Sequence, residues 1–314
     1  MKTNFEKSAI RKQTNTNEKE ENNMTNCKMI MDARATGRGH NVFLETLKAC
    51  LVFLGATLIS QLLSAVVIAV LGVADNDIFS TLGFLWGEVI GIAVIILYCC
   101  FCEKRSISSV GFVKKNWWKE YLRGFSTGFG MILAVVLVGT ALGAFQFTGF
   151  SDSFNPIMLL LFLGGFMIQG MFEEVVCRGY MMVSLARKSP VTVAVVCNAV
   201  FFALLHVGND GFGVLAFTNL TLFGIFASMY TLKTGNIWAV GALHTVWNFA
   251  QGCFFGLSVS GMELMPSVFK FNSTEMILAN GGAFGPEGGY VVTIVVAIEI
   301  ITLLCSMYKK NVKQ

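Results

Sequence analysis

Charged residues are scarce in this sequence. Only 13% of the 314 residues are Asp, Glu, Lys or Arg, whereas 54% are hydrophobic, and the mean hydropathy is +0.65. These values lie outside the range of soluble globular domains and indicate an integral membrane protein. The basic residues form no nucleic-acid-binding surface and no DNA or RNA motif is present, so no nucleic-acid partner is expected.

A disulfide framework is not expected either, although the chain has nine cysteines. Most of them lie in apolar runs, where Cys behaves as a small hydrophobic residue. The group Cys99, Cys100 and Cys102 could be a metal or acylation site near a membrane face, but a zinc site would need further ligands. Histidine is the scarcest candidate catalytic residue, with only His40, His206 and His244.

Eight apolar stretches are each near the length of ~20 residues that an α-helix needs to cross a bilayer. They lie at about 41–73, 79–102, 121–147, 156–185, 190–207, 212–232, 236–257 and 289–308. The first is too long for a signal-peptide core and is read as a retained helix. The sequence therefore predicts an all-α fold, a polytopic membrane helical bundle of about eight transmembrane helices with both termini on one side.

Two polar tails flank this bundle. Residues 1–41 are rich in Asn, Lys, Glu and Thr and have few large apolar side chains, which predicts a disordered tail. Residues 42–308 form the predicted transmembrane bundle, and residues 309–314 form a short C-terminal tail.

The positions of Lys and Arg predict the orientation of the bundle. Twenty of the 23 basic residues lie in the two tails and in alternate loops, whereas the opposite loops are acidic and contain one basic residue, Lys270. By the positive-inside rule, both tails are cytoplasmic. We expect a multi-pass protein of the plasma (cell) membrane.

Few ionisable side chains lie within the predicted membrane helices. Each costs about 2.5 to 3.5 kcal/mol at the helix centre on insertion scales, so by default such groups face the interior of the bundle and suggest function. They are Glu88, Glu173, Glu174, Arg178, His206, His244 and Glu299, and Asn198 and Asn248 are uncharged polar residues in similar positions.

The segment FEEVVCRGY at 172–180 holds three of these charges. Glu174 and Arg178 are four residues apart on one helix face, which allows an ion pair. Glu173 lies about 100 degrees around the helix from Glu174 and has no local partner. A carboxylate of this kind in an apolar site is suited to act as a general base.

Two further patterns could complete a site. His206 follows Phe202 by four residues, and Asn248 follows His244 by four residues. If the three helices converge, one cavity would contain a carboxylate, two imidazoles and an amide, which can activate a water and stabilise an oxyanion. Helix length places His206 deeper than Glu173, so convergence requires the helix at 190–207 to be tilted or displaced.

Structural roles remain open for each of these residues. His206 could cap its helix, and His244 and Asn248 could form hydrogen bonds between helices. Glu88 and Glu299 have no comparable neighbours and are expected to be structural, as is His40 at the membrane edge.

Together the three patterns resemble the motifs of the CPBP intramembrane proteases, a family that includes type II CAAX prenyl endopeptidases and bacteriocin-processing or immunity proteins. The motifs are Glu-Glu-x-x-x-Arg at 173–178, Phe-x-x-x-His at 202–206 and His-x-x-x-Asn at 244–248. The resemblance implies a protease-like core at about 156–257 and hydrolysis of a peptide bond in the membrane. It also implies that Glu173 and His206 activate the water, that His244 and Asn248 stabilise the oxyanion, and that Glu174 and Arg178 hold the helix in register.

The involvement of a metal stays open at this point. Either no cofactor is required or a divalent metal such as Zn²⁺ takes part, in which case Glu173, His206 and His244 could supply three ligands. The helix motif H-E-x-x-H is absent, and Asn248 suits an oxyanion hole better than a zinc site.

The expected partners are the lipid bilayer and a membrane-associated or lipidated peptide or protein, or a bacteriocin-type leader. Two other classes of function are compatible with the same residues. One is a non-catalytic membrane immunity or scaffold protein that uses the cavity to bind a partner. The other is a proton-coupled transporter, although no inverted repeat is evident.

Overall fold

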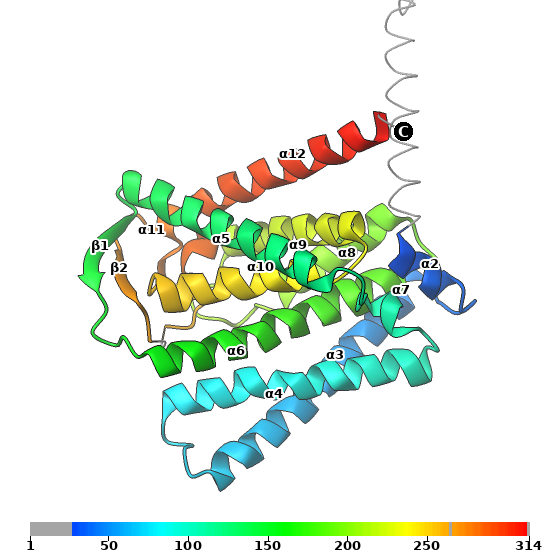
Figure 1. Cartoon of the computed structure of the whole chain (residues 1–314), viewed down its shortest axis with the longest axis horizontal. Helices are drawn as coiled ribbons and strands as arrows, with labels where there is room; N and C mark the ends of the chain where they lie inside the picture. The colour runs from blue at the N-terminus through cyan, green and yellow to red at the C-terminus, as the bar shows by residue number, and fades with distance from the viewer. Residues whose placement is uncertain (1–26, 264–265, 313–314) are drawn as a thin grey trace, which may run out of the picture.

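The computed structural model describes residues 27–263 and 266–312. It is a mostly helical bundle in which the long helices run along the long axis of the molecule (Figure 1). α4 packs on α3 and on α6, α6 packs on α10, and α10 packs on α5, while α9 contacts α8 and α12. The short helices α2 and α7 lie at one end of the bundle and the strands β1 and β2 at the other (Figure 1).

Six helical segments of the described chain are long and apolar enough to cross a membrane. They are α3 (Val42–Val70), α4 with the π-helical η1 (Asp77–Cys102), α5 (Trp117–Ala141), α6 continued through η3 into α7 (Pro156–Leu185), α9 (Val214–Thr234) and α12 (Tyr290–Val312). The protein is therefore a polytopic helical membrane protein. α3 begins and α12 ends at the same end of the bundle (Figure 1), as the sequence predicts for an even number of crossings.

Two of the eight predicted crossings are shorter than expected. The stretch at 190–207 forms α8 (Val191–Leu204) and the stretch at 236–257 forms α10 (Trp238–Phe249), which continues as the π-helical η4 (Ala250–Phe254). Neither is among the six candidate spans of the described chain. Hydropathy overestimated the helix at 190–207 because it counted apolar residues that form a turn after Leu204.

A small sheet departs from the all-α prediction. β1 (Phe145–Phe150) pairs antiparallel with β2 (Phe269–Ser273), and a bulge lies between Phe147 and Gly149. The apolar stretch predicted as a helix over 121–147 thus ends as a strand. The helix stops because Gly143 adopts a φ of 78°, a conformation that glycine reaches without strain.

Part of the predicted N-terminal tail is ordered. α2 (Lys28–Arg34) buries Met29, Ile30 and Ala33, and the Arg34 guanidinium donates to the carbonyl of Ala186. The prediction of disorder fails here because these apolar residues occupy one face of a short helix that packs on η2 (Ile107–Val110) and α7 (Val183–Leu185). The prediction for residues 1–26 lies outside the described residues. At the other terminus, α12 extends through four residues of the predicted C-terminal tail.

A network of buried charges ties α3 to the turns beside α7. Lys48 contacts Glu45 at 2.8 Å and Glu103 at 2.7 Å, and Arg187 contacts the same two carboxylates at 3.1 and 2.9 Å. Burial by itself raises the pKa of the Glu103 carboxyl, but the hydrogen bond from Lys48 and the nearby Arg187 and Arg105 guanidiniums bring that pKa below its usual value. The network fixes the α2 end of the bundle and lies outside the cavity described below.

Two glycines allow α5 to approach α10 closely. A Cβ atom at Gly124 would lie 1.8 Å from the carbonyl oxygen of Ala239, and one at Gly128 would lie 2.5 Å from that of Leu243. Small residues four apart are a common means of close helix packing in membranes. This contact holds α10, which carries two predicted site residues, against a long membrane-spanning helix.

We predict that Gly124→Ala destabilises the bundle by about 1 to 3 kcal/mol, because the added methyl group meets backbone that must move. Gly130→Ala is the matched control in the same helix, since a Cβ there meets nothing within 4 Å. Thermal unfolding of both variants in the same detergent measures the difference. Equal midpoints for the two variants would contradict the packing argument.

Candidate active site

The two glutamates of the central motif are the last residues of α6 (Pro156–Glu174), and the π-helical η3 (Val175–Met182) follows directly. α6 comes unusually close to α10 at this level, since a Cβ atom at Gly170 would lie 2.8 Å from the backbone nitrogen of Thr245. The close approach brings the motif of α6 next to the His-x-x-x-Asn motif of α10. The π-helical η3 begins directly after Glu174, and the π-helical η4 begins two residues after Asn248. Such π-helical turns are frequent at functional sites.

The Glu174 carboxylate joins the two helices. It is fully buried, and its Oε1 atom accepts from Arg178 Nη1 at 2.8 Å and from His244 Nδ1 at 2.9 Å. The ion pair predicted between Glu174 and Arg178 is therefore present in the structure. The same carboxylate also orients the His244 ring, a contact that the sequence did not indicate.

Arg178 extends this contact to two more helices. Its Nη2 donates to the carbonyl of Gly224 on α9 at 3.3 Å, and its guanidinium lies over the Phe202 ring of α8, 4.7 Å from the ring centroid. A planar, permanently charged guanidinium can make both kinds of contact at once. One buried side chain thus links α6, α8 and α9.

Glu173 has a different environment from its neighbour. Its side chain keeps 18% of its exposure, and its Oε2 lies 3.6 Å from His244 Nε2. Oε1 accepts a short hydrogen bond from Gln169 Nε2, whereas Oε2 is buried and has no hydrogen-bond partner in the described chain. Glu173 is therefore a carboxylate with one oxygen held by Gln169 and the other near His244 but without a hydrogen bond to the described residues.

Gln169 is a site residue that the sequence analysis missed. Its amide nitrogen donates to Glu173, and its Oε1 accepts from Asn248 Nδ2 at 2.9 Å. The sequence does contain a signal for this contact. Gln169 is a polar residue in an apolar helix and lies four residues before Glu173, on the same helix face.

His206 lies in the turn that follows α8. Its Nδ1 bonds to the carbonyl of Phe202 at 3.0 Å. A carbonyl only accepts, so Nδ1 carries the hydrogen and Nε2 of the neutral ring keeps its lone pair. The side chain is buried and lies at the wall of a cavity.

This cavity has a volume of about 180 Å³ and brings the predicted residues together. Glu173, His206, His244 and Asn248 all line it. The depth mismatch predicted for His206 is resolved because α8 is short and the chain turns before His206. Glu174 and Arg178 lie behind this wall and are fully buried.

The segment between η4 and α12 forms another wall of the cavity. Ser260 and Glu287 both line it, and the Glu287 carboxylate accepts from the Ser260 backbone and hydroxyl and from Trp247 Nε1. Asn219 of α9 donates to the carbonyl of Glu287 at 2.8 Å. These hydrogen bonds hold Ser260 and Glu287 against α9 and α10.

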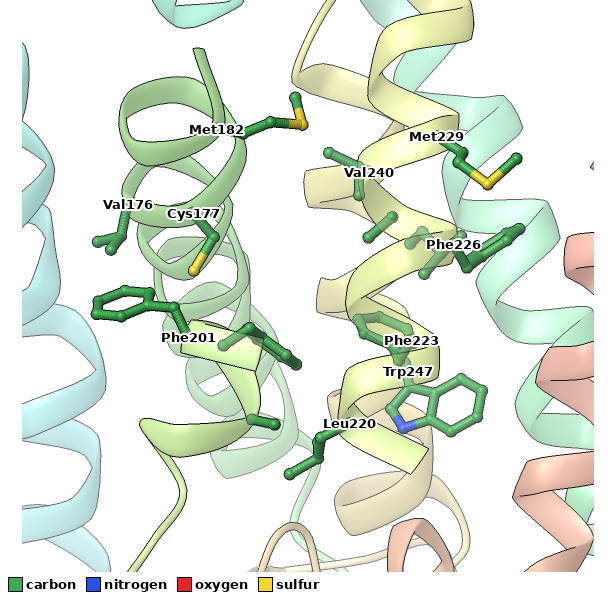
Figure 2. Close-up of a cluster of buried hydrophobic side chains, with 14 of the residues drawn as sticks. Val176, Cys177, Met182, Phe201, Leu220, Phe223, Phe226, Met229, Val240 and Trp247 are labelled. Atoms are coloured by element: carbon green, nitrogen blue, oxygen red, sulfur yellow. The ribbon is translucent and has the colours of Figure 1, made fainter. Parts of the chain in front are cut away.

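Apolar packing supports the site from behind. Figure 2 shows Phe223, Phe226 and Met229 of α9 beside Val240 and Trp247 of α10, with Val176 and Cys177 of η3 across from them. The Phe223 ring meets the His244 ring edge to face at 5.5 Å. This packing and the Glu174 hydrogen bond leave the His244 ring little freedom to rotate.

Of the other polar residues singled out from the sequence, only Glu88 lines the cavity in the described chain. Asn198 donates to Ser228 Oγ at 2.9 Å and does not line the cavity. Glu88, expected to be structural, does line it, whereas His40 and Glu299 do not. The roles assigned to the six motif residues remain predictions.

No described group of three or more His, Cys, Asp or Glu residues is arranged to hold a metal ion. Glu173, His206 and His244 therefore do not form the ligand set considered from the sequence. His244 Nδ1 bonds to Glu174 and His206 Nδ1 bonds to a backbone carbonyl, so the second ring nitrogen of each histidine, Nε2, is the one that these bonds leave free. The metalloprotease interpretation is therefore not supported in the described chain.

The fold and the cavity define a polytopic helical membrane protein with a buried carboxylate, imidazole and amide site. Residues 153–250 match the family model described as "Type II CAAX prenyl endopeptidase Rce1-like". The predicted resemblance to the CPBP proteases is confirmed over these residues, and the matched family is one of peptidases. No curated protein and no solved structure gives a significant match.

We predict that Arg178→Met destabilises the protein by about 3 to 5 kcal/mol, because it leaves the Glu174 carboxylate buried without a cation. Arg123→Met is the control, since Arg123 pairs with Glu120 at the surface with its side chain 67% exposed, and such pairs contribute ~0 to 1 kcal/mol. Adding Glu174→Gln to Arg178→Met should restore part of the loss. Unfolding midpoints in detergent provide the comparison, and similar losses for both Arg variants would refute it.

Proposed function

We propose that this protein is an intramembrane endopeptidase that hydrolyses a peptide bond in a membrane-associated or lipidated peptide or a bacteriocin-type leader. The observation that carries the proposal is the cavity shared by Glu173, His206, His244 and Asn248, because it combines a base with hydrogen-bond donors among mostly apolar side chains. The family match supports the class of reaction. The basic tails support a plasma-membrane protein with both termini in the cytoplasm.

Glu173 and His206 activate the water. The unpaired Oε2 of Glu173 takes a proton, and Nε2 of His206 accepts the second hydrogen of the same water as a hydrogen bond. The resulting hydroxide attacks the peptide carbonyl. The proton held by Glu173 then passes to the leaving nitrogen, so that one water and one peptide bond become a carboxyl and an amine.

His244 and Asn248 stabilise the oxyanion formed by that attack. The Asn248 amide has two N–H donors, and only one of them is used by Gln169. His244 donates from Nε2 when its ring is protonated, and the carboxylates at 2.9 and 3.6 Å from its two nitrogens balance that charge. Removing one oxyanion donor typically costs 10²- to 10³-fold in kcat.

Gln169 positions both halves of this machinery. Its amide orients Glu173 through one end and Asn248 through the other, so the base and an oxyanion donor are held at a fixed separation. A misplacement of about 1 Å in such an arrangement can cost 10²-fold in rate.

The direct test is a comparison of membrane peptides from cells that carry the native protein or a variant. We expect Glu173→Gln and His206→Ala to reduce processing of the substrate by at least about 10²-fold, because each removes a group that activates the water. Quantitative peptide mass spectrometry measures the uncleaved substrate, and immunoblotting confirms equal protein levels.

Glu299→Gln is the control for this test, because it makes the same chemical change in a membrane helix outside the cavity. If both motif variants process every peptide at the native rate, the peptidase proposal is wrong. Intact function in those variants together with loss on changing the loop at 258–288 would instead favour the non-catalytic immunity or scaffold function.

For Gln169→Leu we expect kcat to fall about 10- to 100-fold with little change in KM, because the residue orients catalytic groups without binding the ground state. Steady-state kinetics on one cleaved peptide separates the two constants. Thr218→Val is a control, because Thr218 bonds only to the backbone of its own helix. A rise in KM at constant kcat would show that Gln169 binds substrate instead.

A further inference from the structure

Glu88 of α4 (Asp77–Leu97) is a carboxylate that the proposed chemistry does not use. It lines the cavity that contains Glu173, and its Oε2 atom is buried with no hydrogen-bond partner in the described chain. The nearby Thr57 of α3 also lines the cavity, and its hydroxyl oxygen is likewise unpaired. Burying a polar atom without a hydrogen-bond partner costs free energy. A ligand with hydrogen-bond donors would satisfy both atoms.

The cavity itself supplies no Lys or Arg to Glu88 from the described residues, and the carboxylates beside the His244 ring are those of Glu173 and Glu174. Its described lining includes the carboxylates of Glu88, Glu173 and Glu287 but no Lys or Arg. Arg178 lies behind the wall, where it pairs with Glu174, and Glu287 is held by Trp247 and Ser260. A carboxylate in an apolar helix is tolerated when a positive charge compensates it.

The surroundings of Glu88 suit a long basic side chain. Phe53 and Phe172 line the same cavity, and their rings stack with centroids 6.4 Å apart. Aromatic rings pack against the aliphatic stem of Lys or Arg and attract its charged end. Glu88 and Glu173 line the same cavity, so a group bound at Glu88 occupies the space that Glu173 faces.

We propose that Glu88 is a specificity residue that binds a Lys or Arg side chain of the peptide substrate near the scissile bond. This inference rests on the proposed peptidase function and narrows its substrates to peptides with a basic residue at the cleavage site. The charge of the substrate completes a site in which the protein provides the carboxylate, a hydroxyl and two aromatic rings.

The experiment uses the full-length protein in detergent and internally quenched peptides with a C-terminal palmitoyl anchor. A library varies each position between Lys and norleucine, which has a similar apolar stem and no charge. The native protein should favour Lys over norleucine at one position by about 10- to 100-fold in kcat/KM, the discrimination expected for a hydrogen bond to a charged group.

Glu88→Gln should reduce that preference to within about threefold, because the loss falls on the Lys peptide. Glu88→Asp should retain part of it, and Glu299→Gln should retain all of it, since Glu299 lies outside the cavity. Three results would overturn the inference: no preference for Lys in the native protein, an unchanged preference in Glu88→Gln, or an equal loss of activity on both peptides.

A binding measurement separates this inference from the proposed function. Fluorescence anisotropy with Lys and norleucine peptides of the same sequences, labelled with a fluorophore and no quencher, reports their affinity ratio without relying on cleavage. If the native protein cleaves none of the peptides, the proposed function fails, yet a Lys preference in binding that Glu88→Gln abolishes would still support the role of Glu88. Equal affinity for both peptides would overturn it.

Discussion

A single buried carboxylate, that of Glu174, holds the core of this protein together. It accepts from Arg178 and from His244 with the same oxygen, and Arg178 in turn contacts α8 and α9. Inside an apolar bundle such a contact is stable only when its charges and donors are paired, because an uncompensated charge costs several kcal/mol. The pairing therefore fixes how four helices meet, and every other feature of the cavity depends on that arrangement.

The two adjacent glutamates illustrate how environment separates chemical roles. Glu174 points into the helix interface and is fully buried, whereas Glu173 lies about 100 degrees around the helix and reaches the cavity. The first is a structural partner, and the second has an unpaired oxygen available for proton transfer. The sequence predicted this division from spacing alone, because the distance of four residues between Glu174 and Arg178 is a property of any α-helix.

The polar residues of the cavity meet two opposing requirements within a membrane. The cavity must keep polar groups in an apolar environment, and it must leave some of them unsatisfied so that they can act on a substrate. The Gln169 amide bonds to Asn248 and Glu173, and the segment that carries Glu287 closes one wall, so most polar atoms are paired. Three of the unpaired atoms, Glu173 Oε2, Glu88 Oε2 and the Thr57 hydroxyl oxygen, belong to residues that line the cavity, where a water or a substrate can reach them.

The sequence by itself determined the membrane class, the helical segments, the motif residues and the Glu174–Arg178 pair, because hydropathy and helical spacing are local properties. Local rules did not predict the strand at 145–150 or the ordered α2, since both depend on contacts with distant parts of the chain. Only the tertiary structure decided that α8 ends early enough for His206 to reach the cavity and that Gln169 joins the site. It also placed Glu88, expected from the sequence to be structural, on the cavity wall, because α4 packs on α6.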